Sequence, residues 1–294
     1  MATDPMVDFI FCGPGKTAST WIYQCLREHP DITVPKTDSV GYFDNKYYRG
    51  TEWYETHFPK GSKPSTVGEF SQGYISHPRA AHRIAKEVPD VDLFFCIRNP
   101  IRRAFSHWWH GYGKGYHDYE FDQVLENHAN YRMWAEPGFY AHHLERFDEI
   151  FDEDQIHLLF FDDLKESNME FIKEIFRILS VDETFVPSLV GSTSNEAASQ
   201  APKLWLQTTR WLRTNAPQAL KRNLLEPVYH SVRNIVESRS EYESGMDPTI
   251  RQELELLYAS DVRRLSEKTG RDFSHWFEKI DLYDDTRDLQ PNVA

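Results

Sequence analysis

The stretch Phe9-Ile-Phe-Cys-Gly-Pro-Gly-Lys-Thr-Ala-Ser-Thr-Trp21 decides the fold of this chain. A short apolar run ends at a Gly-Pro-Gly turn, Lys16 follows, and small hydroxyl residues lead into a helix-like stretch that reaches Leu26. A strand that runs through a turn into a helix N-terminus is an anion site, because unpaired backbone N–H groups and the helix dipole point at the ligand. Lys16 adds a full positive charge. The stretch therefore predicts that the chain binds a phosphate-like group here.

The common triphosphate-binding loop matches this stretch only in part. That loop has a glycine, four further residues and then Gly-Lys-Ser/Thr. Gly15-Lys16-Thr17 supplies the second half, but Ile10 stands where the first glycine is required. A second apolar run, residues 156–162, predicts a strand that ends in an aspartate, a candidate carboxylate for magnesium. Many α/β proteins have such a strand, so a nucleotide triphosphatase is the weaker interpretation.

A second anion-binding pattern lies in Asp92-Leu-Phe-Phe-Cys-Ile-Arg-Asn-Pro-Ile-Arg-Arg-Ala-Phe-Ser-His107. The continuous apolar run predicts a strand that is covered on both faces, and Pro100 suits the first turn of a helix. Arg98 follows the strand, and Ser106 lies about two turns into the helix. Ligands of open α/β sheets bind beyond the carboxyl ends of the strands. We therefore expect Arg98 at the same sheet edge as Lys16, where its guanidinium can grip phosphate oxygens.

Two anion sites at one sheet edge indicate a nucleotide with two separate anionic groups. Here the chain resembles the sulfotransferases that use 3′-phosphoadenosine 5′-phosphosulfate (PAPS). Residues 16–20 are similar to that family's 5′-phosphosulfate loop, and Arg98-Asn-Pro with Arg102 and Ser106 is similar to its 3′-phosphate motif. Further segments resemble the bacterial and heparan-sulfate branches: His29-Pro-Asp-Ile32, Tyr42-Phe-Asp44, Trp53-Tyr54, Phe58-Pro59, Gly138-Phe-Tyr140, Phe161-Asp-Asp-Leu164 and Thr269-Gly-Arg-Asp-Phe-Ser-His-Trp276.

The resemblance implies an α/β, P-loop-like three-layer fold, with a mostly parallel central sheet between helices and a helical C-terminal third. It implies PAPS as the donor co-substrate and no metal. The cofactor-binding residues that it implies are Lys16, Thr17, Ala18, Ser19, Thr20, Arg98 and Ser106. Lys16 would neutralise the charge that builds on the departing phosphate during sulfuryl transfer. The alternatives are a P-loop kinase or nucleotide hydrolase, and a non-catalytic nucleotide-binding module.

The general base is the point at which this chain departs from the family pattern. Ser39 stands where the related branches carry a glutamate, four residues before the second aromatic of the Tyr42-Phe43 pair. An attacking hydroxyl needs a base, so a substitute carboxylate is expected. Asp38 is the first candidate and Glu69 the second. Three histidines are further candidates, each of which is more often structural: His77, His107 and His110.

Charge and composition narrow the range of molecules that the chain is expected to bind. Lys and Arg number 33 against 46 Asp and Glu, a net charge of −13, which argues against nonspecific nucleic-acid binding. The acidic balance favours a neutral or cationic small acceptor over a polyanionic glycan, although a sugar, a lipid headgroup and a small metabolite all stay open. Four tryptophans are candidates for an acceptor pocket, with core packing as the commoner role: Trp108, Trp109, Trp205 and Trp211.

The cysteines and the hydropathy predict a cytoplasmic protein. The three cysteines, Cys12, Cys25 and Cys96, fall in apolar segments without metal-ligand spacing, which indicates free thiols in a reducing compartment. No signal peptide and no apolar run long enough to span a bilayer is evident in the sequence.

Strands and helices alternate along residues 7–180, which predicts a nucleotide-binding α/β core within one domain over 1–294. The small, polar residues 187–201 predict either a lid over the cofactor or a plain linker, and a helical region is expected over 202–277. Residues 31–60 are expected to be irregular. The expected strands are 7–12, 65–70, 92–97 and 155–161, and the expected helices are 18–28, 78–88, 100–112, 139–152, 167–179, 202–214, 218–237 and 247–268.

Overall fold

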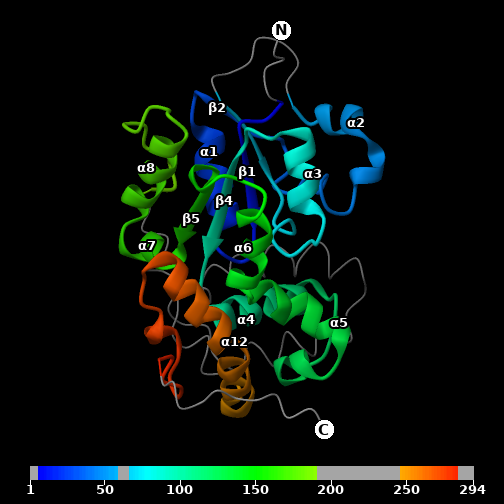
Figure 1. Cartoon of the computed structure of the whole chain (residues 1–294), viewed down its shortest axis with the longest axis vertical. Helices are drawn as coiled ribbons and strands as arrows, with labels where there is room; N and C mark the ends of the chain where they lie inside the picture. The colour runs from blue at the N-terminus through cyan, green and yellow to red at the C-terminus, as the bar shows by residue number, and fades with distance from the viewer. Residues whose placement is uncertain (1–5, 59–65, 191–245, 284–294) are drawn as a thin grey trace, which may run out of the picture.

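A central parallel sheet organises the chain (Figure 1). The computed structural model describes residues 6–58, 66–190 and 246–283. The five strands lie in the order β2-β3-β1-β4-β5, and each pairs with its neighbours in parallel. The strands are β1 Phe9–Gly13, β2 Ile32–Thr33, β3 Thr66–Phe70, β4 Asp92–Ile97 and β5 Ile156–Phe160. All five carboxyl ends therefore point to one edge of the sheet.

Helices cover both faces of the sheet, so the strands are mostly apolar, with the buried Glu69 of β3 as an exception. Phe9 and Phe11 of β1 pack with α1 and α8 in one cluster, whereas Ile10 and Cys12 face α3, α6 and α12 in the other. This alternation is the two-residue period of a strand between two buried layers. The helices are α1 Ser19–Glu28, α2 Thr51–Glu55, α3 Ala80–Glu87, α4 Pro100–Lys114, α5 His128–Asn130, α6 Tyr140–Asp148, α7 Phe161–Glu166, α8 Asn168–Ile178 and α12 Pro248–Thr269.

The α/β, P-loop-like architecture expected from the sequence is confirmed, and most predicted elements lie within a few residues of the observed ones. Residues 31–60 are less irregular than expected, because they contain β2, α2 and the 3-10 turn Tyr47–Arg49. The predicted strand 155–161 ends one residue earlier, and a short helix, α7, follows it at once. A strand of two residues, such as β2, or a helix of five, such as α2, is too short to show a hydrophobic period in the sequence.

The C-terminal helix α12 packs against α6, below the carboxyl edge of the sheet in Figure 1. Asp261 of α12 is 2% exposed and accepts hydrogen bonds from the backbone N–H groups of Ala141 and His142 at 3.0 and 2.9 Å. A carboxylate at a helix N-terminus satisfies donors that the helix itself leaves open. The helix predicted over 247–268 is thus confirmed, while the helices predicted at 202–214 and 218–237 and most of the 187–201 loop lie outside the described residues.

None of the helices within residues 6–58, 66–190 and 246–283 combines the length and apolar character needed to cross a bilayer.

Candidate functional site

The loop after β1 has the backbone of an anion site. Lys16 and Ala18 both adopt left-handed conformations, with φ of 74° and 70°. This region is costly for residues other than glycine, so tertiary contacts must hold the loop in shape. Loops of this kind turn successive backbone N–H groups toward one concavity. The Lys16 loop, residues 13–18, therefore offers a cradle of N–H donors beside a lysine.

The start of α1 completes that cradle. No side chain caps the N-terminus of α1, and its first intrahelical bond runs from the Ile22 N–H to the Ala18 carbonyl at 3.0 Å. The N–H groups of the first turn are thus open to a bound anion. Thr17 is fully buried, and its hydroxyl donates to the Pro14 carbonyl at 2.7 Å, so it shapes the loop from inside. Ser19 is buried at the helix start, whereas Thr20 is exposed.

Glycines allow the turn after β3 to lie directly on the Lys16 loop. A Cβ at Gly13 would meet the Gln72 carbonyl oxygen at 2.2 Å, and a Cβ at Gly15 would lie 3.3 Å from Oε1 of Gln72. Gly13 also has a φ of 101°, which side chains rarely tolerate. The Gly-Pro-Gly turn is therefore required by close packing at the sheet edge, and it brings the β3 turn into the site.

Arg98 lies against the Lys16 loop at the carboxyl edge of the sheet. Arg98 directly follows β4, its Nη1 donates to the Lys16 carbonyl at 2.9 Å, and its guanidinium lies 4.4 Å from the centre of the Phe161 ring. Ser106 is 2% exposed, and its Oγ has no hydrogen-bond partner within the described part of the chain. A buried hydroxyl without a partner is costly, so a ligand oxygen is the natural acceptor there. The pair fits a phosphate group next to the Lys16 loop.

The helix that carries Ser106 is anchored at its start. Asn99 is the N-cap of α4, and its Oδ1 accepts from the Ile101 and Arg102 N–H groups at 3.0 and 3.1 Å. Its Nδ2 donates to the Trp276 carbonyl at 2.9 Å. The segment 269–276, which the sequence comparison with the family singled out, thus supports the Arg98 turn from the C-terminal side.

The two carboxylates that follow β5, Asp162 and Asp163, both bind the same C-terminal segment. Asp162 accepts from the Trp276 indole at 2.9 Å and from Lys165 at 3.3 Å, and Asp163 forms a bidentate pair with Arg271. Burial alone would raise the pKa of Asp162, but the bond from Trp276 and the charge of Lys165 outweigh it and lower that pKa. Asp162 therefore holds the C-terminal segment, which replaces its candidate role as a magnesium ligand.

Glu69 lies in a closed cage of hydroxyl groups. It is fully buried, and it accepts hydrogen bonds from Tyr54 at 2.7 Å, from Ser71 at 2.5 Å and from Tyr74 at 2.7 Å. Burial raises the pKa of Glu69 to about 7, against the lowering effect of these three donors, and the charge of Asp44 adds to the rise. We name Glu69, Tyr54, Ser71 and Tyr74 the Glu69 cage.

The cage fixes the segment that follows Ser39. The Ser71 hydroxyl accepts from the Gly41 N–H at 2.7 Å, and the Tyr74 hydroxyl accepts from the Phe43 N–H at 3.0 Å. Each of these hydroxyls thus donates to Glu69 and accepts from the 41–43 backbone. This arrangement gives Glu69 a structural role, because its cage anchors the 41–43 backbone.

Asp38, the other predicted base, is half-buried in the segment before Val40. Burial raises the pKa of Tyr23 on α1, Arg27 lowers it and the charge of Asp38 adds to the rise, so Asp38 lies within electrostatic reach of the Tyr23 hydroxyl. The sequence reasoning missed a third carboxylate, Asp44. A Cβ at Gly73 would lie 2.8 Å from Oδ2 of Asp44, so this carboxylate packs on the β3 turn that covers the Lys16 loop. The sequence signal for Asp44 is the family-like segment Tyr42-Phe-Asp44 that contains it.

The candidate histidines differ in their surroundings. Burial, Arg103 and Lys16 lower the pKa of His107 far below its ordinary value, so this imidazole is neutral and within electrostatic reach of the Lys16 loop. Its ring packs edge-on against Trp134, with ring centres 4.7 Å apart. Burial and the charge of Arg83 also lower the pKa of His77.

Trp108 is 4% exposed within an aromatic cluster, which gives it a core role, and Trp205 and Trp211 lie outside the described residues.

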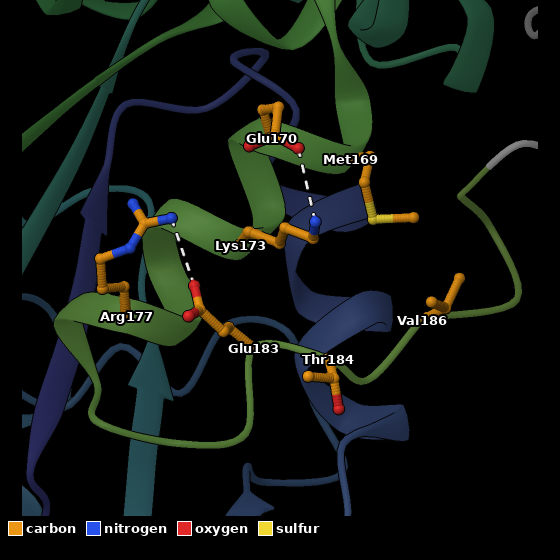
Figure 2. Close-up of a pocket in the computed structure, with 7 residues that line it drawn as sticks. All are labelled: Met169, Glu170, Lys173, Arg177, Glu183, Thr184 and Val186. Atoms are coloured by element: carbon orange, nitrogen blue, oxygen red, sulfur yellow. Dashed lines mark hydrogen bonds and ion pairs between the residues drawn. The ribbon is translucent and has the colours of Figure 1, made fainter.

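A surface groove of about 410 Å³ lies elsewhere, between α8 and residues 183–186 (Figure 2). Its charged residues pair with each other, Lys173 with Glu170 at 3.5 Å and Arg177 with Glu183 at 3.2 Å. The opposite face of α8 is the one that packs on the sheet, so the groove lies away from the Lys16 loop. Exposed pairs of this kind contribute little binding or stability, and we assign the groove no role.

Comparison with known proteins decides between the nucleotide-binding interpretations. The model of the sulfotransferase domain family matches residues 7–225. The chain belongs to the sulfotransferase family. It is therefore an enzyme of the transferase class, and the match gives no support to the kinase or to a non-catalytic module. The Lys16 loop and the Arg98 turn both lie inside the matched range.

Relatives and solved structures agree with this sulfotransferase assignment. The human bifunctional heparan sulfate N-deacetylase/N-sulfotransferase 3 is 29% identical over 199 residues, which make up 60% of this chain. The chain spans only 23% of that relative's length. A sulfotransferase from Alicyclobacillus acidocaldarius superposes with a TM-score of 0.68 at 20% identity, covering 94% of this chain and 99% of that one. A mouse sulfotransferase complexed with PAP superposes with a TM-score of 0.53 at 14% identity, covering 90% and 89%.

Proposed function

We propose that this sulfotransferase transfers the sulfuryl group of PAPS to a hydroxyl or amine of a small-molecule or saccharide acceptor. The observation that carries the proposal is the meeting of two anion sites, the Lys16 loop and the Arg98–Ser106 pair, at one sheet edge. The uncapped start of α1 and the Lys16 loop would hold the 5′-phosphosulfate. Arg98 and the buried Ser106 hydroxyl would hold the 3′-phosphate. The PAP complex of the mouse structure supports the choice of donor.

Lys16 has the central chemical role in this proposal. A lone pair of the acceptor oxygen or nitrogen forms a bond to sulfur while the bond from sulfur to the phosphate oxygen breaks. The electron pair of the broken bond stays on the phosphate, where negative charge builds. The Lys16 ammonium and the loop N–H groups stabilise that charge more strongly in the transition state than in the bound donor.

For the acceptor proton we propose Asp38 as the base and Glu69 as a positioning residue. Asp38 is half-buried and hence accessible to solvent, whereas the three hydroxyls of the Glu69 cage enclose Glu69. Asp38→Asn is expected to lower kcat about a hundredfold or more, since a general base contributes that much to proton removal. Asp90→Asn, at an exposed aspartate before the amino end of β4, is the matched control, and it should leave kcat nearly unchanged. Loss of turnover in Asp44→Asn alone would move the base to Asp44.

The acceptor class is inferred from a relative and from the charge of the chain. The N-sulfotransferase named among the relatives supports an amine as one acceptor group. The net charge of −13 favours a neutral or cationic acceptor.

The three cysteines are free and buried, and burial raises the pKa of each thiol, that of Cys25 to about 12. Inert thiols of this kind suit the reducing, cytoplasmic location that we infer for the protein.

The donor is tested by calorimetric titration with adenosine 3′,5′-bisphosphate beside ATP with magnesium. We expect micromolar or tighter binding of the bisphosphate and at least tenfold weaker binding of ATP, because the chain has no first glycine for a triphosphate loop. Binding of ATP without binding of the bisphosphate would overturn the proposed donor and return the Lys16 loop to nucleoside triphosphates.

A further inference from the structure

The Arg98 side chain bridges the two anion sites. Its Nη1 donates to the backbone carbonyl of Lys16 at 2.9 Å, so the side chain that we assign to the 3′-phosphate also holds the 5′ loop. A guanidinium carries five N–H donors in a fixed fork. Because the fork carries several donors, one can bind the loop carbonyl and others can bind a phosphate. The sheet order explains the contact, because β4 is the direct neighbour of β1.

The Lys16 backbone needs such a support. A residue with a Cβ at φ 74° lies in a sparsely populated region that persists only when its surroundings fix it. The hydroxyl of Thr17 holds the loop from one side through the Pro14 carbonyl. Arg98 holds it from the other side at the carbonyl of the strained residue itself. Without Arg98, the Lys16 peptide loses the hydrogen bond that fixes the left-handed turn.

Arg98 is itself fixed by three other parts of the fold. The Tyr140 hydroxyl of α6 donates to the Arg98 carbonyl at 2.7 Å, and the Phe161 ring of α7 lies under the guanidinium. The next residue, Asn99, is tied to Trp276 near the C-terminal helix. The bridge from β4 to the Lys16 loop is thus rigid at its β4 end, and a change at Arg98 is passed to the loop.

We propose that Arg98 is a positioning residue for Lys16, so that it sets the shape of the 5′-phosphosulfate site in addition to binding the 3′-phosphate. This inference rests on the proposed function. Its consequence is specific: loss of Arg98 weakens the binding of ligands that carry no 3′-phosphate at all. A purely local 3′-phosphate ligand would have no such effect.

The test compares three nucleotides on matched variants. Adenosine 3′,5′-bisphosphate is titrated by calorimetry, and adenosine 5′-phosphate and adenosine 3′-phosphate are measured by competition against it. Ser106→Ala is the control, because the Ser106 hydroxyl is assigned to the 3′-phosphate and makes no hydrogen bond to the Lys16 loop. Ser106→Ala should weaken the two ligands with a 3′-phosphate and leave adenosine 5′-phosphate unchanged. Arg98→Ala should weaken all three, the 5′-phosphate by about fivefold or more, the effect of one hydrogen bond.

Arg98→Lys provides a second variant that keeps a cation against Phe161. A lysine ammonium lacks the planar fork that serves the loop carbonyl and a phosphate together. Arg98→Lys should therefore retain more 3′-phosphate binding than Arg98→Ala, yet lose 5′-phosphate affinity to a similar degree. Thermal unfolding verifies that each variant is folded.

The outcomes separate the two proposals. If the wild type does not bind the bisphosphate, the proposed function fails. If it binds the bisphosphate and both Arg98 variants bind adenosine 5′-phosphate as the wild type does, the positioning role alone is overturned. Failure of adenosine 5′-phosphate to compete with the bisphosphate on the wild type would also overturn it, since the 5′ site would then contribute no binding to be shaped.

Discussion

Replacing Lys16 with methionine is expected to lower the rate of sulfuryl transfer by about a hundred- to a thousandfold. That is the usual loss when one preorganised group that stabilises developing charge is removed. Methionine keeps most of the aliphatic stem and the Cβ at this left-handed position, so the change isolates the charge. The rate is measured as release of adenosine 3′,5′-bisphosphate from PAPS, with the acceptor that gives turnover in a screen of amines, phenols and sugars.

The effect should fall mainly on kcat. Charge on the leaving phosphate grows only as the sulfur–oxygen bond breaks, so Lys16 acts more strongly on the transition state than on the bound donor. Lys173→Met, on the outer face of α8, is the matched control and should behave as the wild type. A Lys16→Met variant that keeps kcat and loses only donor affinity would show that Lys16 binds the donor without stabilising the leaving group.

The sheet edge that carries the proposed nucleotide site could be predicted from the sequence because its signals are local. The Lys16 loop and Arg98 each follow an apolar strand, and parallel strands end at one edge, so their proximity followed from the alternation of strands and helices. The hydrogen bond from Arg98 to Lys16 could not be predicted. It depends on β4 pairing directly with β1, with a register shift between Phe11 and Gly13.

The Glu69 cage could not be predicted from the sequence, for a different reason. Its members are spread from Tyr54 to Tyr74, and the N–H groups that it holds, at Gly41 and Phe43, come from a segment expected to be irregular. No hydrophobic period marks a hydrogen-bonded network of this kind. The sequence could show that Glu69 is a carboxylate within the expected strand 65–70, which made it a candidate base. Only the tertiary structure shows that three hydroxyls enclose its carboxylate.

The stability contributed by Glu69 is expected to depend on pH, and Glu69→Gln should remove that dependence. The folded-state pKa is raised from 4.5 to about 7 by burial. Between these values the folded protein binds more protons at this site than the unfolded chain, so the free energy of unfolding falls as pH rises. The stabilisation is full below pH 4.5 and is lost as pH rises through about 7. The loss amounts to about 3 kcal/mol, at about 1.4 kcal/mol for each pKa unit.

The measurement is urea unfolding of the wild type and Glu69→Gln at matched pH values between 5 and 8, the range suggested by that pKa. All other groups titrate alike in both proteins, so the difference between their free energies of unfolding reports Glu69 alone. The wild type should lose stability relative to Glu69→Gln as pH rises. A difference that stays flat would mean that Glu69 titrates near its ordinary value, and a difference of opposite slope would mean that the three hydroxyl donors outweigh burial.

The cage also links this titration to the active site. Ser71 and Tyr74 hold Gly41 and Phe43 through hydroxyls whose own protons go to Glu69. Protonation puts an O–H on Glu69 while its remaining lone pairs can still accept, so the hydrogen bonding inside the cage changes as Glu69 titrates. Tyr54→Phe removes one donor without removing the carboxylate, and it should raise the Glu69 pKa further. That variant should therefore lose stability over a higher pH range than the wild type, because the carboxylate has fewer donors to keep it ionised.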